Sequence, residues 1–225
     1  MKRVLFFLSG GLLLAGAAQA QIGIRVGGNT GVFTKSAPSY MEEVATQRQL
    51  GYQVGIFYQA QLSKHLSLVP EVQFSRERFS VSKNRPLFDS QFGSDYDQSL
   101  SYLNLPILLR GSIGVFYVEA GPQLSLLVGG RAEGTELLNG GFVLHGSPIP
   151  VAIEAAATDS YHRFDAGPCV GVGVKLPAGL GIGLRAYWGL TKLTTDKGYS
   201  LYDQTYTGFQ HRQTLQASLA YQLSK

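Results

Sequence analysis

His145 and Ser147 form a His-x-Ser pair, an arrangement in which an imidazole can take the proton of a nucleophilic serine hydroxyl. Glu154 or Asp159 could orient the histidine. The pair lies in a long loop-like segment next to a glycine and a proline, and a His-x-Ser pair often occurs by chance in loops. We therefore expect no catalytic residues.

Candidate metal and cofactor sites are equally weak. Asp89, Asp95 and Asp97 could bind calcium weakly, but a solvated acidic surface is the simpler interpretation. Cys169 is the one cysteine, so it cannot form an intrachain disulfide, and we expect a buried, inert thiol. The glycine-rich residues 171–183 resemble a phosphate-binding loop only superficially, because no helix follows them. The sequence predicts no cofactor and no metal.

The composition excludes several classes of protein. Of the 225 residues only 15% are charged, against about 25% in an average soluble domain. Hydrophobic residues make up 44% and glycines number 28, which is unlike a disordered tail or a disulfide scaffold. The net charge is +4, but no basic run with interleaved aromatic residues exists, so nucleic-acid binding is not expected.

The first 20 residues have the pattern of a cleaved signal peptide. Lys2 and Arg3 precede an apolar run that is too short to span a bilayer, and Ala18-Gln19-Ala20 is a small-x-small cleavage pattern. We expect a mature chain over residues 21–225 whose formal charge falls from +4 to +2 when Lys2 and Arg3 are removed. An uncleaved N-terminal anchor is the alternative.

The rest of the chain alternates between apolar and polar residues, which is the period of a β-strand. In residues 52–62, for example, Tyr52, Val54 and Ile56 share one face, and Gln53 and Gly55 share the other. The same pattern predicts strands at 22–33, 52–62, 66–77, 101–110, 115–127, 162–176, 180–190 and 212–223. Each is long enough for a tilted strand to cross a bilayer.

Connections between these strands alternate in length. Tight turns lie near residues 63–65, 111–114 and 177–179, and long polar segments lie near 34–51, 78–100, 128–161 and 191–211. This is typical of an all-β, transmembrane, antiparallel up-and-down β-barrel of about eight strands, with short periplasmic turns and long external loops. A soluble lipocalin-like barrel is the alternative, but charge is scarce on the apolar rows. The predicted location is the bacterial outer membrane.

The charged residues of the predicted strands are concentrated on the polar face of each strand. Because these residues alternate with the apolar ones, we expect their side chains to point into the lumen. There they should form a charge network in which Glu71 and Glu119 are the central acids. Buried charges should pair because a single buried charge is costly. The network either plugs the lumen or forms an ion or proton pathway, and a plug is favoured. The inward charged residues are Arg25, Glu71, Glu77, Arg110, Glu119, Arg163, Asp165, Lys175, Arg185 and Arg212.

Aromatic residues on the apolar rows gather near strand ends, as in the two aromatic girdles of membrane barrels. The predicted girdle residues are Tyr52, Phe74, Phe164 and Trp188 at the outer interface, with Phe116 and Tyr221 at the inner one. Four prolines fit this pattern poorly, because proline removes a hydrogen bond from a strand ladder. They are Pro70, Pro106, Pro122 and Pro168.

Several strand sequences form a recognisable set: residues 102–110 (YLNLPILLR) and 116–124 (FYVEAGPQL), with support from residues 22–29, 68–75 and 187–191. Together they resemble the PorT-like outer-membrane β-barrel family. The resemblance covers nearly the whole mature chain. It implies an outer-membrane barrel and assigns no activity, and the secretion role of the family's namesake is not carried over.

These observations lead to three hypotheses of function. The favoured one is a plugged barrel with a structural or interaction role through its external loops. The second is a narrow pore or a barrel associated with secretion or transport, and the third is an enzyme acting on lipid A. The expected partners are outer-membrane lipid, the barrel-insertion machinery during assembly, and an unidentified protein at the external loops.

Overall fold

Alternating sequence produces long antiparallel strands over nearly all of the described chain. A computed structural model describes residues 21–35, 43–87, 90–138, 149–156, 158, 161–193 and 209–223. The strands are β1 (Gln21–Lys35), β2 (Glu43–Ser63), β3 (Leu66–Leu87), β4 (Ser90–Ile113), β5 (Phe116–Leu138), β6 (Ile149–Ala156), β7 (Phe164–Lys175), β8 (Leu180–Trp188) and β9 (Phe209–Leu223). A short 3₁₀ turn, η1 (Pro177–Gly179), precedes β8.

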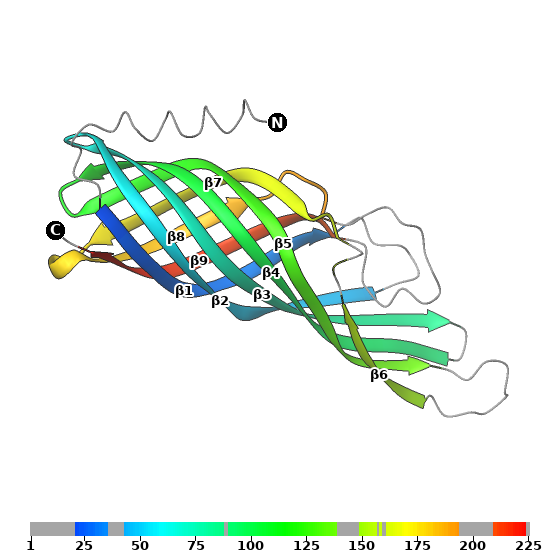
Figure 1. The fold of residues 1–225 in the computed structure, drawn as a ribbon. Coiled ribbons are helices and arrows are strands. Elements are labelled where there is room, and N and C mark those ends of the chain that lie inside the picture. The colour runs from blue at the N-terminus through cyan, green and yellow to red at the C-terminus, as the bar shows by residue number, and fades with distance from the viewer. Residues whose placement is uncertain are drawn as a thin grey trace, which may run out of the picture.

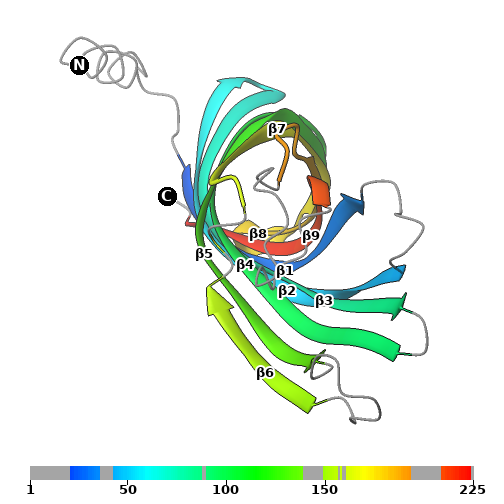
Figure 2. The same cartoon turned by 90° about the vertical axis from the view of Figure 1, so that its right-hand side faces the viewer.

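Eight of these strands close into a ring, as Figures 1 and 2 show. Neighbours in the ring follow the order β1-β2-β3-β4-β5-β7-β8-β9, and β9 pairs back onto β1. The pairing of β4 with β5 completes the circle, which leaves β6 outside it. The predicted fold class, an eight-stranded antiparallel barrel, is confirmed.

Tight turns join the strands at one end of the barrel, where β1 also begins and β9 ends (Figure 1). The turn between β4 and β5 contains Gly114 with φ of 60°, a left-handed conformation that glycine adopts without strain. η1 places Ala178 and Gly179 in the same region. By the general rule for outer-membrane barrels, this end faces the periplasm.

At the opposite end the sheet continues beyond the ring. β3, β4 and β5 run on as a twisted extension to which β2 contributes one side and β6 the other (Figure 2). Residues 78–100 and 128–161, predicted as long loops, are therefore largely strand. Most of residues 78–100 are polar, so apolar–polar alternation does not mark the strands there, because both faces of the extension lie outside the apolar band.

Each of the four prolines lies where pairing with one neighbouring strand is interrupted or has ended. Pro70, Pro106 and Pro122 occupy short interruptions of the β2–β3, β3–β4 and β4–β5 ladders, and these interruptions leave the register unchanged. Pro168 lies just beyond the last β7–β8 pair. A residue without an N–H group is tolerated at such positions, so prolines are compatible with a closed barrel here.

Outward-facing residues form an uncharged band around the ring. Positions such as Ile24, Val54, Leu105, Val172 and Leu219 are exposed and apolar. Along 22–28, 52–62, 68–74, 103–109, 116–128, 164–174, 180–188 and 213–223, no outward position carries a charge. This surface is suited to contact with lipid, and its exposure to water would be unfavourable. Within the described residues, no helix has the length and apolar character needed to cross a membrane.

Candidate functional site in the barrel lumen

The lumen is built from the inward positions of all eight ring strands. Strand periodicity places every second side chain inside, and Arg25, Glu71 and Arg185 are almost completely buried there. Small residues make room for these large side chains. A Cβ atom on Gly171 would lie 2.9 Å from Arg185 Cγ and 3.0 Å from Glu119 Oε1. The glycine on the polar rows therefore has a packing role.

Five charged side chains form the first of two charged layers, here called the Glu71 layer: Arg25, Glu71, Arg110, Glu119 and Arg185. Arg185 donates from Nη1 to Glu71 Oε2 at 2.8 Å and from Nε to Glu119 Oε1 at 2.6 Å. Arg25 donates to the same Glu71 oxygen at 3.1 Å, and Arg110 donates to Glu119 Oε2 at 2.8 Å. Each carboxylate therefore bridges two guanidinium groups.

This layer crosses the full width of the barrel. Glu71 lies on β3 and Arg185 on β8, and these strands are four positions apart in either direction around the ring. Direct contact between opposite walls means that side chains occupy the centre of the lumen. Aromatic rings support the arginines, since Arg25 lies 5.4 Å from the Phe57 ring centroid and Arg110 lies 4.3 Å from that of Tyr117.

A second layer, here called the Glu77 layer, lies further toward the extension. Arg212 Nε donates to both Glu77 carboxylate oxygens at 3.1 Å, and its guanidinium lies 3.8 Å from the Tyr102 ring centroid. Arg212 Nη1 also approaches Asn104 Oδ1 at 3.4 Å. Asn104 on β4 and Arg212 on β9 stand on opposite walls. The Glu77 layer thus closes the lumen a second time.

Amide and hydroxyl groups surround the Glu77 layer. Asn104 Nδ2 donates to Ser75 Oγ at 2.9 Å, and Ser125 Oγ donates to Asn104 Oδ1 at 2.7 Å. Asp165 accepts a hydrogen bond from the Tyr187 hydroxyl at 2.8 Å. The hydroxyl groups of Ser75, Ser125 and Tyr187 therefore already have hydrogen-bond partners within the packed lumen.

An apolar cluster covers the Glu77 layer on the side of the extension, and the sequence analysis missed it. Tyr161 comes from the segment before β7 and Leu193 from the segment after β8, and a hydrogen bond of 2.8 Å joins Gln98 Nε2 to the Tyr161 hydroxyl. Parity with Asn104 could have revealed the inward position of Leu100 and Tyr102. The cluster comprises Phe79, Leu100, Tyr102, Leu127, Ala132, Tyr161 and Leu193.

Two predicted lumen cations lie away from the two layers. Lys175 is half-buried at the periplasmic end, where its Nζ donates to Ser112 Oγ at 2.9 Å. Arg163 is exposed, so its predicted inward position is wrong. It precedes β7, which begins at Phe164, and the strand alternation does not extend to it. Arg25, Glu71, Glu77, Arg110, Glu119, Asp165, Arg185 and Arg212 are all buried in the lumen.

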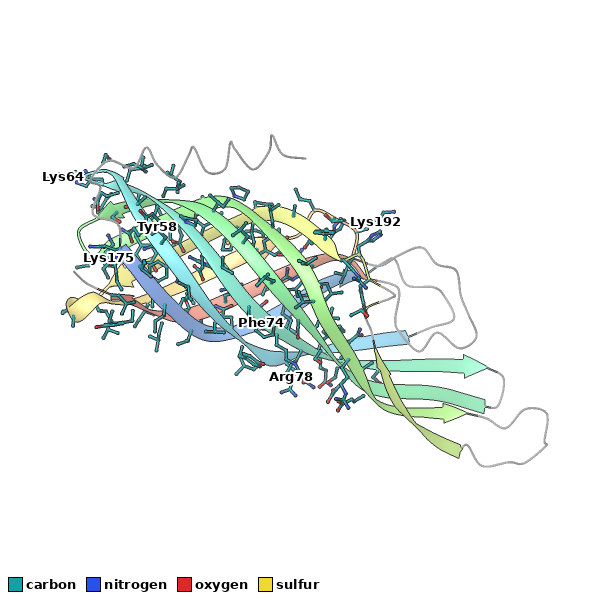
Figure 3. The ribbon with its side chains drawn as sticks, in the orientation of Figure 1. Tyr58, Lys64, Phe74, Arg78, Lys175 and Lys192 are labelled. Carbon is teal, nitrogen blue, oxygen red and sulfur yellow. The ribbon has the colours of Figure 1, made fainter. Side chains whose placement is uncertain are left out.

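The six aromatic residues singled out from the sequence point outward. Tyr52 and Phe74 are neighbours with ring centroids 6.3 Å apart, and Phe74 is half-buried. Figure 3 shows Phe74 on the wall of the barrel and Tyr58 nearer the periplasmic turns. The exposed members are Tyr52, Phe116, Phe164, Trp188 and Tyr221.

Some sequence candidates cannot be placed. His145, Ser147, Asp159 and Asp89 lie outside the described residues, as do the side chains of Glu154 and Asp95. Across the described ranges, no group of three or more His, Cys, Asp or Glu side chains could hold a metal ion. Cys169 is buried beside Leu108 and Tyr187.

Comparison with solved structures finds small outer-membrane barrels at low sequence identity. The attachment invasion locus protein Ail of Yersinia pestis is 9% identical, with a TM-score of 0.43 and coverage of 91% of this chain and 99% of that one. OprG from Pseudomonas aeruginosa is 10% identical, with a TM-score of 0.44 and coverage of 94% and 99%. The outer membrane protease OmpT from Escherichia coli is 10% identical, with a TM-score of 0.38 and coverage of 91% and 96%. No curated protein matches the sequence.

A family model provides the assignment that these distant structures cannot. The model for the outer membrane protein beta-barrel domain matches residues 17–195, which is most of the chain. The closed ring and its uncharged outer band agree with that match. The chain belongs to the outer membrane protein beta-barrel domain family.

Proposed function

We propose that this protein is a closed outer-membrane barrel with a structural or interaction role. The observation that supports closure best is the contact between Arg185 and Glu71 across the diameter of the ring. A conducting path would have to displace this contact and the Arg212–Asn104 contact on the second level. Separating one buried ion pair and leaving its partners unpaired costs about 3–5 kcal/mol.

A narrow pore, or a secretion- or transport-associated barrel of the PorT-like kind, is the second candidate. It draws support from polar atoms in the lumen that lack a hydrogen-bond partner, among them Arg25 Nη2, Glu71 Oε1 and Arg185 Nη2. Such atoms would favour water between the side chains. They give the lumen a polar lining without changing the contacts that cross it.

Ion efflux from proteoliposomes separates these two candidates. The purified chain is reconstituted into vesicles loaded with potassium, and release is followed with an external dye. A plugged barrel releases potassium no faster than protein-free vesicles. Release that grows in proportion to the amount of folded protein would instead support the pore. A heat-unfolded sample controls for leakage caused by damaged protein.

We also propose that the protein is not an enzyme. In support, the lumen serines Ser75 and Ser125 hydrogen-bond Asn104, and His65 and His162 are exposed on the surface. Incubation with lipid A followed by mass spectrometry tests this proposal. Deacylation that is lost in the Ser147→Ala variant would overturn it.

A barrel in the outer membrane must first be exported and then inserted into the membrane. We infer that the chain loses residues 1–20 and that the barrel-insertion machinery recognises its last strand, where Tyr221 supplies an outward aromatic side chain. Amino-terminal sequencing of protein purified from outer membranes should begin at Gln21. A chain that retains Lys2 and Arg3 would show an uncleaved anchor.

The extension formed by β2–β6 is the surface we assign to an interaction role. Its strands continue well past the uncharged band, so they stand clear of the bilayer (Figure 1). A photo-crosslinking residue at Ser82, an exposed position further along β3, should capture a partner in intact cells, and the same residue at Val172 in the lipid band should not. Equal products from both positions would contradict this assignment.

A further inference from the structure

Three arginines project outward immediately beyond the uncharged band, on the side where the extension leaves the barrel. Arg76 and Arg78 lie on β3, and Arg131 lies on β5. Arg78 and Arg131 are exposed and Arg76 is half-buried. They share the outward face because the inward neighbours Glu77 and Ala132 are buried. This set is here called the arginine patch.

Strand register brings the three arginines together. Arg78 pairs with Ser99 of β4, and Ser99 pairs with Arg131 of β5, so the two arginines flank one serine. Because neighbouring strands lie about 4.8 Å apart, their Cα atoms are separated by roughly 10 Å. Two guanidinium groups at this spacing can both reach an anion bound above the serine. Arg76 Nη2 already donates to Ser99 Oγ at 3.0 Å, which holds it beside this position.

Small residues leave space between the arginines. Ser101 pairs with Arg76 on one side and with Gly129 on the other. A Cβ atom on Gly129 would meet only the Ser101 Cβ atom, at 3.8 Å, so the surface is open there. The patch therefore combines small residues, Ser99, Ser101 and Gly129, with guanidinium groups on both sides.

The patch lies at the edge of the predicted lipid-facing surface. Phe74 is two residues from Arg76 on the same face of β3 and contacts Tyr52 of the outer aromatic set. Figure 3 shows Phe74 on the barrel wall and Arg78 further toward the extension. Leu103 and Val128 continue the apolar surface below the arginines. A ligand that fits this surface has an anionic head and apolar chains.

The arginine patch remains positively charged although two acidic residues lie near it. Glu133 forms an ion pair with Arg131, and Asp97 accepts hydrogen bonds from Gln49 and Ser80. Both carboxylates lie two residues further along their strands, toward the end of the extension and away from Phe74. Arg76 and Arg78 face the apolar band without an acid between them and Phe74. Guanidinium groups suit phosphate because they can donate two parallel hydrogen bonds to it.

We propose that the arginine patch binds the phosphate of an outer-leaflet membrane lipid, with the acyl chains lying on the apolar wall below. The occupant is a lipid because the arginines adjoin the uncharged band, where a soluble anion would gain nothing from Phe74, Leu103 and Val128. This site adds a specific ligand class to the closed barrel and stands whether or not the lumen conducts.

Native mass spectrometry of the full chain, released from detergent micelles with added lipid A, tests the proposal. The patch variant carries Arg76→Gln, Arg78→Gln and Arg131→Gln. The matched control carries Lys64→Gln and Lys192→Gln, which remove exposed charges away from the patch. We expect lipid A to bind wild type and control equally and the patch variant about tenfold more weakly, a difference of about 1.4 kcal/mol.

Two further probes identify the source of the phosphate. Dephosphorylated lipid A should bind wild type as weakly as lipid A binds the patch variant, and millimolar inorganic phosphate should fail to displace lipid A. Equal binding of lipid A to wild type and patch variant, or equal loss in the control, would overturn the proposal. Displacement by a soluble sulfated sugar would assign the patch to a soluble polyanion and would also overturn it. If the triple variant does not fold, Arg78→Gln alone provides the same comparison at an exposed side chain.

Discussion

Arg185 and Glu71 hydrogen-bond at 2.8 Å although they stand on opposite walls of the eight-stranded ring. Both side chains are almost completely buried, and each has a second ionic partner, Glu119 for Arg185 and Arg25 for Glu71. One continuous network therefore links β1, β3, β4, β5 and β8 through the middle of the barrel. The lumen is held together from inside as well as through the strand ladders.

The Glu71 layer contains three arginines and two glutamates, so removing one acid should be costly. We expect Glu119→Gln to lower the free energy of unfolding by about 3–5 kcal/mol, since Arg110 and Arg185 would lose a shared charged partner. Urea titration followed by tryptophan fluorescence measures the change. The matched control is Glu133→Gln, whose ion pair with Arg131 is exposed, and it should cost only about 0–1 kcal/mol. Equal effects of the two variants would contradict a structural role for the layer.

Glu77 and Arg212 should behave as a coupled pair. Each single change, Glu77→Gln or Arg212→Met, leaves one buried ionic or polar group without its partner, so each should destabilise the barrel strongly. The double variant should be more stable than the sum of the single effects implies, with a coupling energy of about 0.5–3 kcal/mol. Equilibrium unfolding of all four proteins provides the cycle. Simple additivity would show that the two side chains do not interact in the membrane.

Gly171 should tolerate a methyl group poorly because the lumen network fills the space around it. The added Cβ of Gly171→Ala would lie 2.9 Å from both Arg185 Cγ and the Leu184 carbonyl oxygen. Overpacking of this kind typically costs about 1–3 kcal/mol. Gly129→Ala is the matched control, since its Cβ meets open surface. We expect thermal unfolding to occur at lower temperature for the first variant only, and a normal melting temperature for Gly171→Ala would imply a looser lumen.

Trp188 is the one tryptophan and reports directly on the outer aromatic set. It lies outward at the end of β8, so lipids brominated close to the head group should quench it more than lipids brominated at the chain ends. The comparison variant combines Trp188→Phe with Val172→Trp, which moves the fluorophore to the middle of the uncharged band. There the order of quenching should reverse. An unchanged order would show that the two positions do not differ in depth.

The sequence predicted the ring well because strand alternation and turn length are local properties. Parity alone placed Arg25, Glu71, Arg110 and Arg185 on inward rows, and all are buried in the lumen. It could not identify which cation meets which acid, because Arg185 and Glu71 are 114 residues apart and come together only when the sheet closes. Glu71 and Glu119, which we expected to be the central acids, each contact two arginines.

The external half of the molecule was less predictable. Alternation normally marks a strand because one face is apolar, and this cue fades where β3, β4 and β5 rise beyond the uncharged band. Arg163 was misplaced for a related reason, since its parity was extended past the start of β7. The apolar cluster around Tyr102 was missed because segments outside the regular strands supply Tyr161 and Leu193.

Single-channel recording in planar bilayers tests the closed lumen most directly. Folded protein, checked by its gel mobility before and after heating, is inserted into a bilayer in concentrated potassium chloride. A lumen crossed by the Arg185–Glu71 and Arg212–Asn104 contacts should give no steady conductance steps in the wild-type chain. Uniform, long-lived steps that scale with salt concentration and disappear when the protein is heated would show an open path and contradict the closed barrel.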